Sequence, residues 1–232
     1  MSRAPTLIQR LFPASQTTDD AFIRDGMSGV ELLQLRELVR CERPKRVLEI
    51  GMANGTSSVM MAEAMHLEQT NGQLTSIDPY QHKPGGYEGA GVQAVRQIPI
   101  AHLLIEDFDY VVLPKMVEVE GDAIYDVILI DGFHSFELTF LDLYYADRLL
   151  KPGGLLLCHD CSSPAVYKAL KWLERNKPYE RIGPPIYSSS QSFGERIWRR
   201  LMGGRDRRER KHNWHMLAAY RSCAPMRCRN MN

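Results

Sequence analysis

Apolar residues along the chain alternate between helical spacing and short unbroken runs. The first clear pattern begins with Ser28 and Glu31, which match a capping box, and continues through leucines at helical spacing until Pro44 forbids a helix. Runs of valine, isoleucine and leucine then alternate with further helical stretches, which predicts strands and helices in turn. We expect helices at 28–43, 56–67, 91–97, 138–149 and 163–176, and strands at 46–50, 74–77, 103–105, 126–130, 155–158 and 214–220.

This alternation predicts the α/β class, with a doubly wound, mostly parallel sheet and helices on both faces. The run at 126–130 supports a parallel sheet, because a strand covered on both faces is apolar throughout. The pattern weakens after Pro185. We place one domain at 27–232, preceded by an N-terminal extension at 1–26 and interrupted by a variable basic insertion at about 187–213.

Composition adds few constraints. The 232 residues carry a formal net charge of +1, which commits the protein to neither nucleic acid nor a membrane surface. Five scattered cysteines argue against a disulfide framework, and we see neither the apolar core of a signal peptide nor a membrane span, so we expect a cytoplasmic protein. Residues 196–211 hold eight basic side chains, which suit either an acidic or nucleic-acid substrate or a solvated helix face.

Candidate chemistry lies directly after the predicted strands, where an open α/β sheet binds its ligands. Strand 46–50 carries Glu49 near its end and leads into a turn from Gly51 to Gly55, which by itself is also compatible with a plain tight connection. Ala53 stands where the dinucleotide fingerprint has its second glycine, so a pyrophosphate fits less well. Acids follow the next strands as well: Asp78 after the second, Glu106 and Asp107 with Phe108 after the third, and Asp131 after the fourth.

Together these residues resemble the class I S-adenosylmethionine-dependent methyltransferases. In that family the glycine turn holds the methionine moiety, the acid after the second strand holds the ribose, and the acid after the third strand faces the adenine amine. The resemblance therefore implies S-adenosylmethionine as the cofactor and gives Asp78 the ribose contact. The cofactor residues that it implies are Glu49, Gly51, Ala53, Gly55, Ser57, Asp78, Asp107 and Phe108.

A narrower resemblance rests on the segments 131–137 and 158–160. They are similar to metal-dependent small-molecule O-methyltransferases, a branch that includes catechol-type and antibiotic-sugar enzymes. The metal ligands implied are Asp131, His159 and Asp160. The branch usually has Asp-Asp or Asp-Asn where this chain has His159-Asp160, so Mg²⁺ is the first candidate and Mn²⁺, Fe²⁺ or Zn²⁺ are alternatives. His159 would otherwise only orient Asp160.

The same resemblance gives His134 and Asp131 catalytic roles. His134 stands three residues after Asp131, where catechol-type relatives carry a base, and a histidine there suits removal of a hydroxyl proton. Other roles are also compatible with these residues: Asp131 and Asp160 could be helix caps, and His134 could contact the cofactor or cap a helix. Cys158 and Cys161 have the spacing of half a zinc motif, but the strand around Cys158 argues for burial.

The favoured function is O-methylation of a hydroxyl group on a small molecule, either a sugar or a phenol, with no membrane partner. The alternatives are an RNA or protein methyltransferase that docks its substrate through 196–211, and a non-catalytic cofactor-binding protein. The sequence Ile130-Asp131-Gly132-Phe133 differs from the Asn/Asp-Pro-Pro-Tyr motif of nucleic-acid amino methyltransferases, which counts against a nucleic-acid substrate. The sequence leaves the acceptor and the oligomeric state open, so a homo-oligomer is compatible with it.

Overall fold

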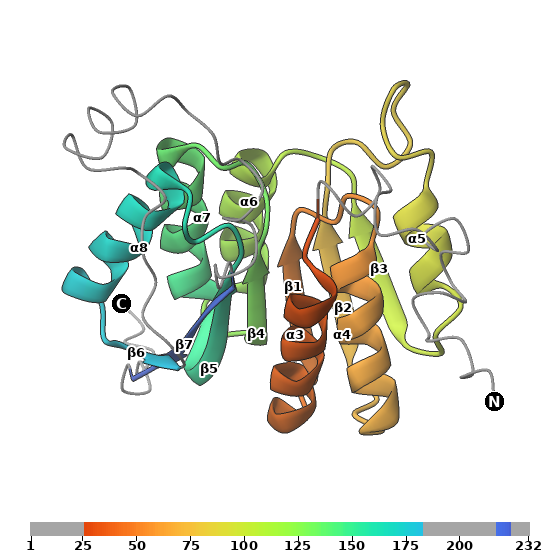
Figure 1. The fold of residues 1–232 in the computed structure, drawn as a ribbon, viewed down its shortest axis with the longest axis horizontal. Helices are drawn as coiled ribbons and strands as arrows, with labels where there is room; N and C mark the ends of the chain where they lie inside the picture. Colours follow the sequence, from red (N-terminus) through yellow and green to blue (C-terminus); the bar gives the residue numbers. More distant parts are fainter. Residues whose placement is uncertain (1–25, 183–216, 224–232) are drawn as a thin grey trace, which may run out of the picture.

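A computed structural model of the chain describes residues 26–182 and 217–223 (Figure 1). Helices and strands alternate along almost all of this part. The helices are α3 (Gly29–Glu42), α4 (Thr56–Leu67), α5 (Ala90–Val95), α6 (Asp109–Glu120), α7 (Phe136–Leu149) and α8 (Pro164–Asn176). The strands are β1 (Arg46–Ile50), β2 (Gln73–Ile77), β3 (Ala101–Ile105), β4 (Tyr125–Ile130), β5 (Leu150–Cys158), β6 (Tyr179–Ile182) and β7 (Ala218–Ser222).

The strands form one sheet in the order β3-β2-β1-β4-β5-β7-β6. The first five strands pair in parallel, while β7 is antiparallel to both β5 and β6. The chain moves outward from β1 to β3 and then returns to the other side of β1 for β4, so the strand order reverses between β1 and β4. The predicted doubly wound, mostly parallel sheet is confirmed.

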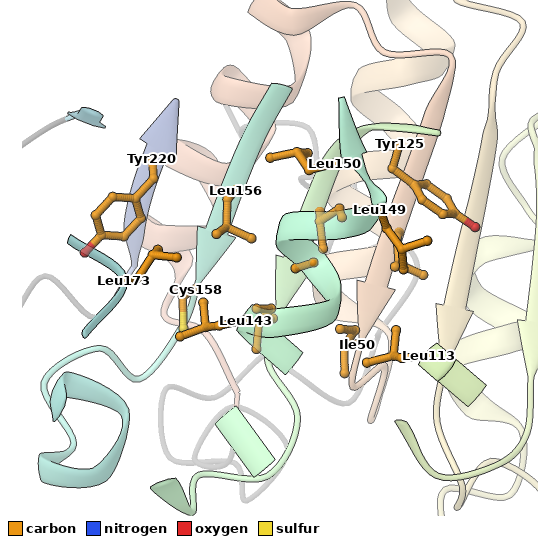
Figure 2. Packing of buried hydrophobic residues seen from close by; sticks show 14 of the residues in the cluster. Ile50, Leu113, Tyr125, Leu143, Leu149, Leu150, Leu156, Cys158, Leu173 and Tyr220 are labelled. Atoms are coloured by element: carbon orange, nitrogen blue, oxygen red, sulfur yellow. The ribbon is translucent and has the colours of Figure 1, made fainter. Parts of the chain in front are cut away.

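Alternate side chains of the central strands feed two separate cores. In β4 and β5, Val127 and Leu155 pack with α3, α4 and α5, whereas Ile128 and Leu156 pack with α6, α7 and α8. Figure 2 shows the second core, where Leu143 of α7 lies near Cys158 and Leu173 of α8 lies beside Tyr220. Period-two alternation between two helical layers explains why these strands are apolar on both faces.

Two elements were not predicted, and the last strand was misplaced. The sequence pattern missed α6, which contains Pro114 and several valines that disfavour a helix by propensity, because burial of Leu113 and its neighbours against the sheet outweighs propensity. It also missed the short edge strand β6. The last strand was expected at 214–220 and is found at Ala218–Ser222, while 214–216 lie outside the described residues.

The expected apolar stripe of α7 is also rotated. Of Leu138, Leu141, Tyr145 and Leu149, only Leu149 is buried, and the other three are half-buried. The buried face holds Thr139, Asp142, Leu143, Ala146 and Leu149. Since α7 contacts both α6 and α8, its flanks are covered by neighbouring helices and its most buried line includes small and polar residues.

Three expectations concern residues that the structure does not describe. The extension at 1–26 is described only at Gly26, and the insertion at 187–213, with the basic segment 196–211, lies outside the described residues. The domain limits therefore stay a prediction. Within the described part, no helix has the length and apolar character needed to cross a membrane.

Core packing gives a stability prediction. Leu156 is fully buried in the central strand β5, so Leu156→Ala should lower the free energy of unfolding by about 2–5 kcal/mol through lost transfer energy and a cavity. Val119 on α6 is 81% exposed, and Val119→Ala should change that energy by less than about 0.5 kcal/mol. Urea denaturation of both variants measures the difference, and equal losses would contradict the assignment of Leu156 to the core.

Candidate active site

Five parallel strands end at the same level, which gathers the residues that follow them. Ile50 pairs with Ile77 on one side and with Ile130 on the other, and the register continues outward to Ile105 and Cys158. The carboxyl ends meet at one edge beside the reversal of strand order, where a ligand crevice is expected. The residues at this edge are Gly51, Asp78, Glu106, Asp131 and His159.

The turn after β1 is built on glycines that leave no room for a side chain. Gly51 has a φ of +87°, and a Cβ there would lie 2.1 Å from the carbonyl oxygen of Asp131. Gly55, at a φ of +79°, begins α4, and its Cβ would lie 2.5 Å from the Cα of Gly91 in α5. The turn is therefore enclosed by backbone from β4 on one side and from α5 on the other.

Asp78 fastens this turn to the end of β2. One carboxylate oxygen accepts hydrogen bonds from the amides of Met52 at 3.1 Å and Ala53 at 2.7 Å. The other oxygen accepts from the amide of Tyr80 at 2.8 Å. The side chain is almost fully buried, and the oxygen bonded only to Tyr80 keeps a lone pair for another donor.

A cavity opens between the ends of β1, β2 and β4. Of the sequence-predicted cofactor residues, Gly51, Ala53 and Asp78 line it, and so does Asp131. Asp107 does not line it, whereas Asp109, the first residue of α6, does. The full lining is Ile50, Gly51, Ala53, Ile77, Asp78, Pro79, Tyr80, Tyr87, Asp109, Asp131, Gly132 and Phe133.

Aromatic side chains meet beside this cavity. Phe108 stacks on Tyr110 at 5.1 Å between ring centroids and on Phe133 at 6.3 Å, and Tyr80 meets its edge at 5.9 Å. The ammonium of Lys83 lies 5.2 Å from the Phe108 ring centroid. Tyr80 and Phe133 belong to the lining, so the cavity presents apolar ring surface next to the carboxylates.

Glu49 and Ser57 lie behind the turn and not in the cavity lining. The Glu49 carboxyl is fully buried and accepts hydrogen bonds of 2.5–2.7 Å from the hydroxyls of Ser57, Ser58 and Ser76. Burial raises the pKa of Glu49 to about 7, although the three hydroxyls partly oppose that rise. Glu49 therefore joins β1 to the first turn of α4 and to β2, and Gly55 likewise shapes the turn from behind.

The structure brings together a second group of polar side chains, which could bind a metal ion, at the ends of β4 and β5. Ligand atoms of Asp131, His134 and Asp160 all lie within 4.8 Å of one another, a spacing that a metal ion could bridge. His134 Nε2 is 3.0 Å from Asp160 Oδ2 and 3.8 Å from Asp131 Oδ1. The nearby Asp131 carboxylate raises the pKa of His134 despite its partial burial.

His159, which the sequence suggested as the third metal ligand, faces inward. Its Nδ1 lies 3.0 Å from Asp131 Oδ1, and its Nε2 lies 3.7 Å from Glu31 Oε2 in the first turn of α3. Burial opposes a charged imidazole, but the two carboxylates outweigh it and raise the pKa of His159 to about 10. Burial also raises the pKa of Glu31, but hydrogen bonds with His159 and Ser28 outweigh burial and lower the pKa to about 2.

Two of these residues were missed by sequence reasoning. Glu31 matched a capping box and does cap α3, so nothing suggested that it also reaches His159, which lies far along the chain. Asp109 was overlooked because α6 was not predicted, although its place soon after β3 was a usable signal. Both residues are acids close to an element boundary, where capping is the commoner role.

The sequence family described as a methyltransferase domain matches residues 48–161, which run from β1 to just past the cluster of Asp131, His134 and Asp160. Residues 48–161 are a methyltransferase domain. The resemblance to class I methyltransferases is thereby confirmed. No curated protein sequence matches the chain significantly.

Solved structures share the fold at low sequence identity. The O-methyltransferase TomG from Streptomyces achromogenes, involved in tomaymycin synthesis and solved with S-adenosylmethionine, has 16% identity and a TM-score of 0.59, covering 82% of this chain and 87% of that one. The O-methyltransferase from Bacillus cereus with S-adenosylhomocysteine has 14% identity and a TM-score of 0.58 over 79% and 84%. The methyltransferase PaMTH1 from Podospora anserina, bound to S-adenosylhomocysteine, has 14% identity and a TM-score of 0.64 over 94% and 88%.

The turn gives a prediction with a matched control. Gly85 has a φ of +77°, and a Cβ there would have nothing within 4 Å, so Gly85→Ala should lower the free energy of unfolding by about 1–2 kcal/mol from backbone strain alone. Gly51→Ala adds a clash with the Asp131 carbonyl and should lower it by about 3 kcal/mol or more. Urea denaturation separates the two, and equal losses would show that β4 yields to the added methyl group.

Proposed function

We propose that this chain transfers the methyl group of S-adenosylmethionine to a hydroxyl oxygen of a small molecule, assisted by a divalent cation. The observation that carries the proposal is the position of Asp131, which lines the cavity and also belongs to the group with His134 and Asp160. A methyl donor in the cavity and an acceptor oxygen at that group would therefore be neighbours. Holding two reactants side by side supplies a large part of the rate of such a transfer.

The cavity suits the proposed cofactor. The amides and dipole at the start of α4 favour a polar or anionic group, and Asp78 keeps a lone pair for a ribose hydroxyl. We assign direct contact with the cofactor to Gly51, Ala53 and Asp78. Glu49, Gly55 and Ser57 instead shape the turn from behind. For adenine, Asp107 and Phe108 remain our candidates, joined by Asp109. TomG and the Bacillus cereus enzyme, which hold this cofactor or its demethylated product, support the assignment and the O-methyl chemistry.

The donor set at the second group suits a divalent cation. Two carboxylates and one imidazole accommodate Mg²⁺ and also Mn²⁺, Fe²⁺ or Zn²⁺. We take His134 as the third ligand in place of His159, because the His159 imidazole is turned toward Asp131 and Glu31. When bound, such a cation would lower the pKa of the acceptor hydroxyl and fix its oxygen.

The protein's own groups divide the remaining work. Asp131 and Asp160 supply negative charge, and His159 holds Asp131 in place through its Nδ1. Phe133 lines the cavity beside Asp131 and offers apolar surface to a phenolic or sugar ring. His134 is half exposed, so it can accept the hydroxyl proton if it is not a ligand. The following two experiments test the cofactor and the cation separately.

Calorimetry should show that the wild-type chain binds S-adenosylhomocysteine. Asp78→Asn should weaken that binding by about 10- to 100-fold, because hydrogen bonds to a charged acceptor are lost. Asp122→Asn removes a half-exposed carboxylate that pairs with Arg148 outside the cavity lining, and it should leave affinity unchanged. Absence of binding by the wild type would refute the cofactor assignment.

Titration with Mn²⁺ alone tests the cation site. His134→Gln and Asp160→Asn should each weaken Mn²⁺ binding by about 10-fold or more, since each removes a ligand. His82→Gln alters an exposed histidine that pairs with Glu106 and serves as the control. If His134 is instead the base, His134→Gln keeps full Mn²⁺ affinity while turnover falls about 10²- to 10⁴-fold. Full turnover after complete chelation would remove the cation from the proposal.

A further inference from the structure

Two buried acids face each other beside the cavity. Asp142 of α7 is fully buried, and neither of its carboxyl oxygens meets an N–H or O–H donor among the described residues. Its neighbour is Asp109, the first residue of α6, which is 4% exposed. Both carboxyls approach Gly132, whose Cβ position lies 3.5 Å from Asp109 Oδ2 and 3.7 Å from Asp142 Oδ2.

No cationic side chain of the described residues offsets these two charges. Within residues 26–182 and 217–223, neither carboxyl forms an ion pair with lysine, arginine or histidine. The thiol of Cys158 in β5 lies near Asp142, and burial raises its pKa well above the usual range, so it stays neutral. Asp131, at the end of β4, lines the same cavity but has its own imidazole partners, His134 and His159. Two adjacent buried carboxyls without a cation cannot both ionise, so they hold one proton between them.

The surroundings decide which acid holds the proton. Burial raises the pKa of Asp109, but its carboxyl accepts a 2.7 Å hydrogen bond from the amide of Tyr110 and lies at the positive end of α6, and both features oppose that rise. Asp142 has no such donor among the described residues, and burial together with Asp109 raises its pKa well above the usual range. Asp142 is therefore the protonated partner and donates to Asp109.

This arrangement affects the cavity because Asp109 lines it and Asp142 does not. We propose that Asp142 is a positioning residue: its carboxyl proton bonds to Asp109 and holds that carboxylate as the acceptor for an N–H donor of the bound nucleoside, its amino group. The identity of the ligand rests on the proposed function. The shared proton does not, so the two can be tested apart.

Stability against pH tests the proton without any ligand. A carboxyl whose pKa is higher in the folded protein than in the unfolded chain contributes stability that is fully present below about pH 4 and is lost as pH rises toward the folded pKa. Asp142→Asn keeps a donor but does not titrate. Its Tm relative to the wild type should therefore rise between about pH 5 and about pH 8, by a few degrees. Asp122→Asn should show no such trend, and a pH-independent difference for Asp142→Asn would overturn the shared proton.

Binding of S-adenosylhomocysteine then tests the positioning role. Asp142→Asn should bind within about threefold of the wild type, whereas Asp142→Leu, similar in shape but without a donor, should bind about 10-fold more weakly. S-inosylhomocysteine, with oxygen in place of the amino group, should bind Asp142→Leu and the wild type with equal affinity. Equal affinity of all three proteins for S-adenosylhomocysteine, or equal loss in both variants, would overturn the role. If the wild type binds no S-adenosylhomocysteine, the proposed function fails. The Tm measurement still shows whether Asp109 and Asp142 share a proton.

Discussion

The contact between Gly51 and the carbonyl of Asp131 is the constraint on which the site depends. It joins β1 to β4 at the point where strand order reverses, and a Cβ at Gly51 would lie 2.1 Å from that oxygen. Because the two backbones touch there, the turn after β1 and the acid after β4 share one cavity wall. A side chain at Gly51 would separate the proposed donor site from the proposed cation site.

Buried acids around this contact are stabilised in three different ways. Glu49 accepts three serine hydroxyls, and Asp131 shares the His159 imidazole with Glu31. Asp109 has only a backbone amide and another acid, Asp142, among the described residues. Hydroxyl donors alone leave a buried carboxyl with a raised pKa, whereas a neighbouring imidazolium lowers the pKa of the carboxyl. Two neighbouring buried carboxyls need a shared proton. Each of these arrangements also connects a helix to the ends of the strands.

The proposed donor and acceptor sides of the site differ in their surroundings. The cavity adjoins rings such as Phe108 and Phe133, while His134 on the other side is half exposed and reaches two carboxylates. The solved structures share the fold at 13–16% identity, so the fold tolerates large changes in sequence. In this chain the buried His159 imidazole meets Asp131, and the more exposed His134 meets Asp160.

The sequence alone determined the order of most strands and helices, the sheet class and the edge where polar residues gather, because apolar periodicity and turn residues are local signals. It did not reveal α6, where burial outweighs the poor propensity of valines and Pro114. It also did not reveal which ionisable side chains meet: Asp109 with Asp142, and Glu31 with His159. Those pairings depend on how α6, α7 and α3 pack against the strand ends, and charge environments between distant residues exist only once the chain has folded.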